Sequence, residues 1–319
     1  AFYQSVARWM KNRHQWDIKP EWLVQAPGVV NALFGIVKTF TEPGDGIIIM
    51  QPVYYPFSAA ITQNGRELVN NALIYEDYAY RIDFDDLEKK AKDPKNKMLI
   101  LCSPHNPIGR VWTREELEKV GRICIDNNVL VVSDEIHFDF ILTGHKHTVF
   151  ANISEEFAQH CIICTAPSKT FNIAGLKISN IVIPNDHLRK QLLEKNQRDF
   201  ASNALGIQAC RICYDDCGAW KDEMLCMIEY NYQQVKKFVE EKLPQIKVIE
   251  LQGTYLLWLD CTALGLSDEE LEKLTLGADL YLDEGYLFGP GGSGFERINL
   301  ACPTRYLMAA MERFQKAIS

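Results

Sequence analysis

Lys169 lies in a short turn between two apolar stretches, a position that could give its amine a chemical use. The run Cys161–Thr165 is typical of a buried strand, the turn Ala166–Asn172 follows it, and a second apolar run begins at Ile178. Lysine is seldom buried unless it is paired or chemically used. A desolvated lysine amine can form a Schiff base with an aldehyde cofactor. The alternative is a solvated loop lysine, so the interpretation depends on the rest of the chain.

Two further polar residues directly follow predicted strands. Asn106 comes after the strand 98–102, and Asp134 comes after the strand 129–133. The alternation of strand, turn and helix predicts an α/β domain with a largely parallel sheet. In such sheets ligands bind outside the carboxyl ends of the strands. We therefore expect Asn106, Asp134 and Lys169 to lie on one rim of the sheet.

These residue types match what pyridoxal 5'-phosphate (PLP) requires of a protein: an amine, an anion opposite the pyridine nitrogen, a donor to the ring oxygen, a stacking group and a phosphate site. A glycine at a helix start also lets an anion approach free backbone N–H groups. The chain offers for these roles Lys169, Asp134, Asn106, Tyr54 and the helix start at Gly28-Val29, with Ser168 and Lys177 as further phosphate contacts.

Each of these residues has another explanation when taken alone. Asp134 could cap a helix, Asn106 could belong to a turn, Tyr54 could be core, and Gly28 could belong to an ordinary turn. Their joint occurrence is what predicts a PLP site.

The elements that position these residues can be predicted from periodicity and capping signals. Thr113 with Glu116, and Ser267 with Glu270, are capping boxes that start helices. Further helices are expected at 1–16, 29–38, 83–92, 187–242 and 306–318. The remaining strands are expected at 46–50, 66–75, 178–183, 246–251, 254–260 and 297–302.

Composition limits the classes of function. The chain has 319 residues, of which 47% are hydrophobic, so it can build a large core with a smaller domain attached. We expect a large domain over 1–244 and a small one over 245–319. The net charge is −8 with both signs mixed, which gives no electrostatic reason to expect nucleic acid or an anionic membrane as partner. No apolar run reaches the ~20 residues of a membrane span.

Ten cysteines raise the question of disulfides or a bound metal. Two C-x-x-C pairs occur, Cys161/Cys164 and Cys210/Cys213. Residues three apart on a strand point to opposite faces, so Cys161 and Cys164 cannot share a metal. No histidine pair completes the second set at finger-like spacing. We expect reduced core thiols without a metal, as is common in cytoplasmic proteins.

Several motifs taken together resemble one family. The chain is similar to fold type I PLP enzymes of the aminotransferase class I/II superfamily at Asn106–Gly109, Asp134–His137, Ser168–Asn172 and Arg297–Ala301. It resembles the cystathionine β-lyase-like C–S lyases of that group at Pro27–Val30, Val53–Phe57, Asp134–His137, Pro167–Leu176 and Gly285–Gly289. The resemblance covers essentially the whole chain. It implies an aspartate-aminotransferase-like α/β fold, with a mostly parallel seven-stranded sheet in a large PLP domain and a small C-terminal α+β domain.

The resemblance also implies a role for each matching residue. Lys169 would form the Schiff base and move the proton, and Asp134 would pair with the pyridinium nitrogen. Asn106 would donate to the ring oxygen, and Tyr54 would stack on the ring. Arg297 would bind the substrate carboxylate as a bidentate fork; without the resemblance, a surface ion pair would be the better interpretation of Arg297.

Three positions depart from the pattern of many aminotransferases. His137 stands where a tyrosine is common, as in the lyase-like branch, and we count it among the cofactor-binding residues. Ala166 replaces a frequent serine, which weakens one phosphate contact. Lys177 replaces an arginine, a point charge in place of a fork.

The resemblance implies a C–S β-lyase that cleaves cystathionine or related cysteine S-conjugates to a thiol, pyruvate and ammonia. The alternative is a PLP-dependent aminotransferase, because both reactions share their early steps. A third possibility is a PLP-binding regulator, although the sequence holds nothing like a DNA-binding module. The resemblance also implies a homodimer, and an N-terminal segment of a few dozen residues before Ala1.

Overall fold

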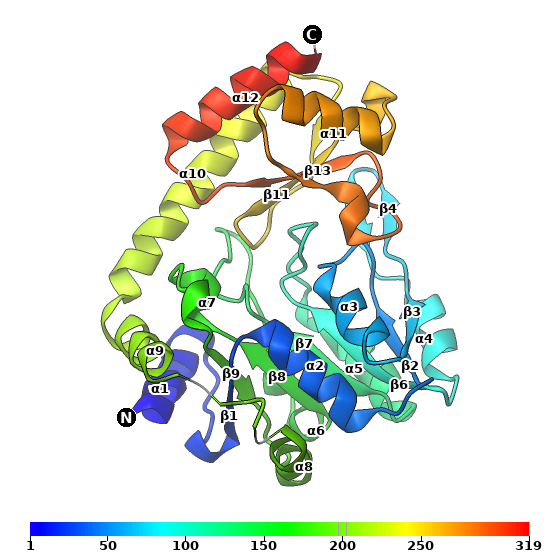
Figure 1. Ribbon diagram of the computed structural model, residues 1–319, viewed down its shortest axis with the longest axis vertical. Helices are drawn as coiled ribbons and strands as arrows, with labels where there is room; N and C mark the ends of the chain where they lie inside the picture. The colour runs from blue at the N-terminus through cyan, green and yellow to red at the C-terminus, as the bar shows by residue number, and fades with distance from the viewer. Residues whose placement is uncertain (197, 202, 319) are drawn as a thin grey trace.

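The computed structural model describes residues 1–196, 198–201 and 203–318 (Figure 1). Most of the chain forms a lower part built on a large sheet. The C-terminal elements, coloured orange and red, form an upper part on a second sheet (Figure 1). The helix α10 (Gly218–Lys242) runs along one side and joins the two parts.

The described residues form a seven-stranded sheet in the order β1-β9-β8-β7-β6-β2-β3. Its strands are β1 (Leu23–Ala26), β2 (Gly46–Ile49), β3 (Glu67–Asn70), β6 (Asn96–Cys102), β7 (Leu130–Asp134), β8 (Cys161–Thr165) and β9 (Ser179–Val182). The pairs from β8 to β3 are parallel, and β9 is antiparallel to both of its neighbours. The predicted α/β fold with a mostly parallel sheet is therefore confirmed.

Strand β8 shows why these apolar runs form strands. All five of its residues are buried, as expected for a parallel strand covered on both faces. Cys161 packs into the core on one face of the sheet, and Cys164 packs into the core on the other face. The predicted divergence of this C-x-x-C pair is confirmed.

Helices cover both faces of the large sheet, as far as the described residues extend. One face packs against side chains of α1 (Phe2–His14), α4 (Phe84–Ala91), α5 (Arg114–Asp126), α6 (Glu155–Gln159) and α9 (Ala204–Asp216). The other face packs against α2 (Val29–Phe40), α3 (Pro56–Thr62) and α8 (Asp186–Asn196). The short α7 (Pro167–Thr170) sits at the rim after β8.

Both predicted capping boxes are present. Thr113 and Glu116 exchange side-chain and backbone hydrogen bonds at the start of α5. Ser267 and Glu270 do the same at the start of α11 (Asp268–Gly277). These local signals fix where the two helices begin.

The second sheet is antiparallel and follows the order β10-β11-β13-β12. Its strands are β10 (Lys247–Val248), β11 (Leu256–Asp260), β12 (Asp283–Glu284) and β13 (Phe295–Asn299). Asp283 lies opposite Arg297 in the register of β12 and β13. Side chains of α10, α11 and α12 (Thr304–Ile318) complete its core.

Two predicted strands are shorter in the structure. The stretch 246–251 forms only the two-residue edge strand β10, although Ile249 and Leu251 still bury their side chains. The stretch 66–75 divides into β3 and the hairpin strand β4 (Ile74–Glu76), which pairs with β5 (Ala79–Arg81). In both stretches apolar side chains are buried beyond the residues that pair with a neighbouring strand. The sequence pattern therefore resembled a longer strand in each case.

The division of the chain after residue 244 stays a prediction. Ile228, Val235 and Val239 of α10 belong to the core of the second sheet. This packing favours a small domain that includes the second half of α10. The remaining short elements are the 3₁₀-helices η1 (Pro20–Trp22), η2 (Phe150–Asn152), η3 (Ala174–Leu176), η4 (Thr262–Leu264) and η5 (Gly285–Phe288).

Within the described ranges, every helix is too short or too polar to cross a lipid bilayer.

Candidate active site

A cavity of about 880 Å³ opens at the carboxyl ends of the large sheet, where the second sheet faces it. The structure brings all ten sequence-predicted site residues into its lining. They are Gly28, Val29, Tyr54, Asn106, Asp134, His137, Ser168, Lys169, Lys177 and Arg297.

Three of these residues lie on one rim, as predicted. Asn106 follows β6, Asp134 ends β7, and Lys169 lies on α7 directly after β8. These strands are neighbours in the sheet. Parallel strands end at the same edge, so their terminal residues converge.

Asp134 is a buried carboxyl with little compensation. Among the described residues its side chain accepts one hydrogen bond, from the backbone N–H of Ile136 at 3.1 Å, and it is nearly inaccessible. Burial raises the pKa of Asp134 to about 7; the nearby Lys169 charge opposes this shift, and Glu135 adds to it. A carboxylate in this position calls for a cationic partner inside the cavity.

Lys169 has the opposite tendency. Burial lowers the pKa of its amine, and the charge of Arg297 lowers it further, while Asp134 and Asp283 act in the other direction. A partly buried amine with a lowered pKa is more readily available as a nucleophile or base.

His137 lies beside these groups as a neutral imidazole. Burial lowers the pKa of His137 to about 3, and the charges of Lys169 and Arg297 contribute. Its buried Nδ1 has no hydrogen-bond partner within the described part of the chain. Its ring centroid is 5.5 Å from that of Tyr255. An orphaned ring nitrogen at the cavity wall is consistent with a polar ligand there.

Arg297 crosses from the second sheet toward the rim. Its NH1 group donates to Oδ1 of Asn106 at 2.8 Å, its NH2 group pairs with Asp283, and its guanidinium lies 4.8 Å from the ring centre of Phe288. Its Nε is buried and finds no partner among the residues described. Both terminal nitrogens of the fork are thus in contact with the chain, and Nε keeps an N–H without a described partner.

The start of α2 also lines the cavity. Gly28 precedes the helix with φ 101°, and no side chain of the described residues caps this end. A Cβ on Gly28 would meet no described atom within 4 Å, so the approach to the backbone is open. Ser168 and Lys177 line the same cavity. Free N–H groups at a helix start with a hydroxyl and a cation nearby suit a phosphate.

Tyr54 stands on the wall near Asn106, whose backbone carbonyl accepts from the backbone N–H of Tyr54 at 3.1 Å. Burial raises the pKa of Tyr54 to about 12, so its hydroxyl stays protonated. Its ring centroid lies 5.4 Å from that of Tyr55. The ring presents an aromatic surface at the cavity.

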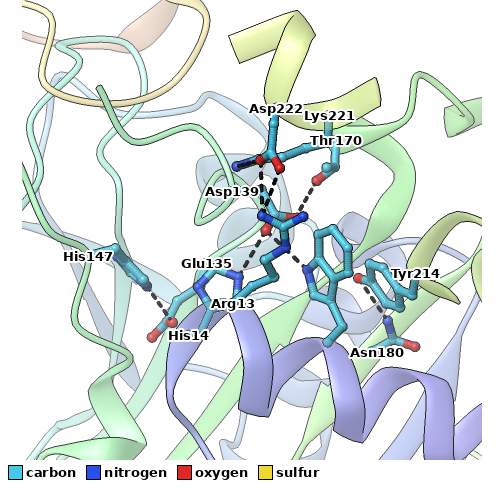
Figure 2. A network of polar contacts seen from close by, with 11 residues as sticks. Arg13, His14, Glu135, Asp139, His147, Thr170, Asn180, Tyr214, Lys221 and Asp222 are labelled. Atoms are coloured by element: carbon cyan, nitrogen blue, oxygen red, sulfur yellow. Dashed lines mark hydrogen bonds and ion pairs between the residues drawn. The ribbon is translucent and has the colours of Figure 1, made fainter. Parts of the chain in front are cut away.

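A buried network behind the cavity holds the turn that carries Lys169. Figure 2 shows Asp139 between His14 and Thr170. Thr170 donates to Asp139 at 2.7 Å, Trp9 donates to it at 3.1 Å, and Nε2 of His14 lies 2.9 Å from it. Burial would raise the pKa of Asp139, but the His14 contact and the Thr170 hydrogen bond hold it below the ordinary value. One carboxylate therefore joins α1 to the residue next to Lys169.

Sequence reasoning did not find this network or several lining residues. Trp9 and Asp139 are 130 positions apart, so no local spacing signal joins them. Tyr55, Tyr255, Asp283 and Asn299 also line the cavity and were not predicted. The aromatic cluster after β2 was the available signal for Tyr55. The others come from the second sheet, where the sequence offered only Arg297.

The residues present fit PLP. Among the described residues no cation forms an ion pair with the buried carboxyl of Asp134, which a protonated pyridine nitrogen would suit, and the Lys169 amine lies in the same cavity. The open helix start at Gly28 suits the phosphate.

The cysteines do not form a comparable site. All ten are free thiols. Across the described residues, no group of three or more His, Cys, Asp or Glu side chains is placed to hold a metal ion.

Comparison with known proteins agrees with this geometry. The family model for aminotransferase class I and II matches residues 1–314. The chain is 45% identical to cystathionine beta-lyase PatB of Bacillus subtilis over 99% of this chain and 82% of the relative. The crystal structure of cystalysin from Treponema denticola, which contains PLP, matches with a TM-score of 0.97 at 46% identity, over 99% of this chain and 81% of that one.

The PLP-bound C–S lyase from Staphylococcus hominis in its complex with L-cycloserine matches with a TM-score of 0.94 at 32% identity. The match covers 99% of this chain and 82% of that one. With the cavity geometry and these matches together, the chain belongs to the aminotransferase class I and II family.

Proposed function

We propose that the protein is a PLP-dependent C–S β-lyase that cleaves cystathionine or related cysteine S-conjugates to a thiol, pyruvate and ammonia. The observation that carries the proposal is the presence, in one cavity, of the buried carboxyl of Asp134 and the partly buried amine of Lys169. The similarity to a cystathionine beta-lyase favours elimination among the reactions that such a site can support.

The residues that would hold PLP follow from the cavity. Lys169 would bind its aldehyde carbon, Asp134 its pyridine nitrogen and Asn106 its ring oxygen. Tyr54 would stack on the ring, and His137 would contact the cofactor beside Asp134. The start of α2 at Gly28-Val29, with Ser168 and Lys177, would hold the phosphate.

Bound PLP supplies an electron-withdrawing ring linked to the amine of the substrate. The remaining work belongs to the protein. Arg297 binds and orients the substrate carboxylate through its fork. Lys169 Nζ, with its lowered pKa, takes the proton from the substrate α-carbon. The carboxylate of Asp134 would stabilise a proton on the pyridine nitrogen of bound PLP. The electron pair of the broken Cα–H bond then forms a Cα–Cβ double bond as the thiolate leaves from the β-carbon and takes up a proton. One water hydrolyses the released enamine to pyruvate and ammonia.

The alternative is a PLP-dependent aminotransferase. The family model that matches the chain covers such enzymes, and they would use the same groups up to removal of the proton. In that reaction Lys169 Nζ would return the proton that it holds and no β-substituent would leave, and a 2-oxo acid would have to enter the site.

The test supplies L-cystathionine to the purified, PLP-loaded protein and measures pyruvate and free thiol, with Lys169→Ala as the control variant. Pyruvate and thiol formed without any added 2-oxo acid, and lost in the variant, would support the lyase. Amino-group transfer that occurs only after a 2-oxo acid is added would replace it with the aminotransferase. A protein that does not bind PLP would overturn both proposals.

We also propose that the protein is a cytoplasmic homodimer. The ten free thiols support a reducing compartment. Leu205, Trp220 and Tyr3 leave large apolar side chains exposed on α9, α10 and α1, which supports a subunit contact. Light scattering after size-exclusion chromatography and cell fractionation test the two proposals; a monomer, or a protein found in an oxidising compartment, would contradict them.

A further inference from the structure

Asp283 occupies a position at the cavity that the proposed reaction does not explain. It lies on the two-residue edge strand β12, directly opposite Arg297, and lines the same cavity as Lys169. Its carboxylate pairs with NH2 of Arg297. The Asp283 side chain is 45% exposed and that of Arg297 is 10% exposed. The proposed carboxylate-binding fork is thus already in contact with a carboxylate of the chain itself.

Arg297 does not depend on Asp283 for its orientation. NH1 is fixed by Oδ1 of Asn106, and the guanidinium lies over the ring of Phe288. Nε still has a free N–H in the described part of the chain. Removal of the Asp283 charge would therefore leave the fork in place. A ligand carboxylate seated on Arg297 has to share the guanidinium with Asp283 or displace it.

The carboxylate of Asp283 and a ligand carboxylate on the same guanidinium repel each other, and this repulsion is stronger away from bulk water. A 2-oxo acid or a simple carboxylic acid brings only negative charge to the cavity. An amino acid brings its carboxylate together with an ammonium on the adjacent carbon, so it enters with no net charge. Asp283 therefore disfavours the first kind of ligand more than the second.

We propose that Asp283 is a specificity-determining residue: it competes for Arg297 and thereby selects zwitterionic amino acids over 2-oxo acids. The inference rests on the proposed function, because it takes Arg297 as the carboxylate-binding residue. In a β-lyase this selection promotes release of the pyruvate product. It also opposes entry of the 2-oxo acid that transamination requires.

The neighbouring acidic residues differ from Asp283 in position. Glu284 lies opposite Glu296 in the same register. Adjacent residues of a strand point to opposite faces, so Glu284 points away from the side of the sheet that carries Asp283 and Arg297. Glu284 is not among the described residues that line the cavity. It is therefore the matched control for a loss of negative charge on β12.

The experiment compares the PLP-loaded wild type with Asp283→Asn and Glu284→Gln. Calorimetry measures the dissociation constants of propionate, pyruvate and L-alanine at fixed ionic strength. In Asp283→Asn we expect propionate and pyruvate to bind about fivefold more tightly, the scale of a half-exposed charge pair, and L-alanine to change much less. Glu284→Gln should leave all three constants unchanged.

Four outcomes would overturn the proposal. Asp283→Asn could weaken all three ligands equally, which would make Asp283 a support for Arg297. Asp283→Asn could change none of the three constants. Glu284→Gln could produce the same effect as Asp283→Asn, which would mean that only the net charge of β12 matters. Propionate binding should also be lost in Arg297→Ala; if it persists, the probe does not sit on Arg297 and the proposal fails.

The outcome is separable from the proposed function. Tighter binding of propionate and pyruvate to Asp283→Asn supports the proposed selection against 2-oxo acids even if cystathionine is not cleaved. Cleavage of cystathionine with no change in these constants would retain the lyase and remove the role of Asp283.

Discussion

We predict that Asp134→Asn stabilises the cofactor-free protein against unfolding, and that the gain grows with pH. Burial raises the pKa of Asp134 from 3.8 to about 7 in the folded protein. Between these two values the folded state holds a proton that the unfolded chain has lost. The contribution of Asp134 to stability is thus most favourable below about pH 4 and falls as the pH rises to about 7.

The structure sets the size of the effect. A shift of about three pH units corresponds to roughly 4 kcal/mol above pH 7, at about 1.4 kcal/mol per unit. Near pH 5 less than half of this penalty has accumulated. Asparagine has no titrating group and can keep the hydrogen bond from the Ile136 N–H. Its advantage should therefore grow by roughly 2–3 kcal/mol between about pH 5 and about pH 8.

Urea unfolding of the cofactor-free protein, followed by tryptophan fluorescence and circular dichroism at several pH values, measures this difference. Asp139→Asn is the matched control, because Asp139 is equally buried but its pKa is lowered, mainly by His14 against the effect of burial. It should destabilise the protein near pH 8 by roughly 1–3 kcal/mol, and less at acid pH. If Asp134→Asn also destabilises near pH 8, or if its effect is independent of pH, the reasoning about Asp134 is wrong.

Three further predictions concern the cavity. Lys169→Ala should lower pyruvate formation from L-cystathionine by ~10³-fold or more, since it removes both the anchor and the base; a smaller loss would mean another group takes the proton. Arg297→Lys should raise KM for cystathionine about tenfold with less effect on kcat, because lysine cannot reproduce the fork or the Asn106 contact; an unchanged KM would contradict its role. Gly28→Ala should cost about 1–2 kcal/mol in thermal unfolding, because of φ 101° and without a steric clash; an unchanged Tm would show that this backbone relaxes freely.

Much of the large sheet could be predicted because its signals are local. The strand Cys161–Thr165 was predicted with the bounds that the structure has, since a short apolar run ended by Ala166-Pro167 allows few alternatives. The capping boxes at Thr113 and Ser267 were equally local. Within these elements, the chain's own short-range chemistry decides the structure.

The second sheet was harder to predict because pairing decides it. β12 consists of two acidic residues, Asp283 and Glu284, with no apolar alternation to mark a strand. β10 has only two paired residues, but the apolar side chains of Ile249 and Leu251, which follow it in the chain, are also buried. Edge strands of this length are defined by their partner and not by their own sequence.

The same distinction applies to the site. Asn106, Asp134 and Lys169 could be placed together because parallel strands end at one edge. Asp139 could not be connected with Trp9 and His14, because that contact depends on how α1 lies across the finished sheet. Asp283 could not be placed at the cavity from the sequence, because its position there follows from its register with Arg297.

The pairing of β1 with β9 has a consequence for the order in which the protein assembles. Leu23 pairs with Val182, and Ala26 pairs with Ser179, so the strand leading into Gly28 has no sheet partner until β9 is in place. Contacts of such large sequence separation form late, because a long loop must close first. During synthesis, the helix start proposed to hold the phosphate can be fixed only after the lysine-bearing turn has emerged. The cofactor would then bind only to chains whose large sheet is complete.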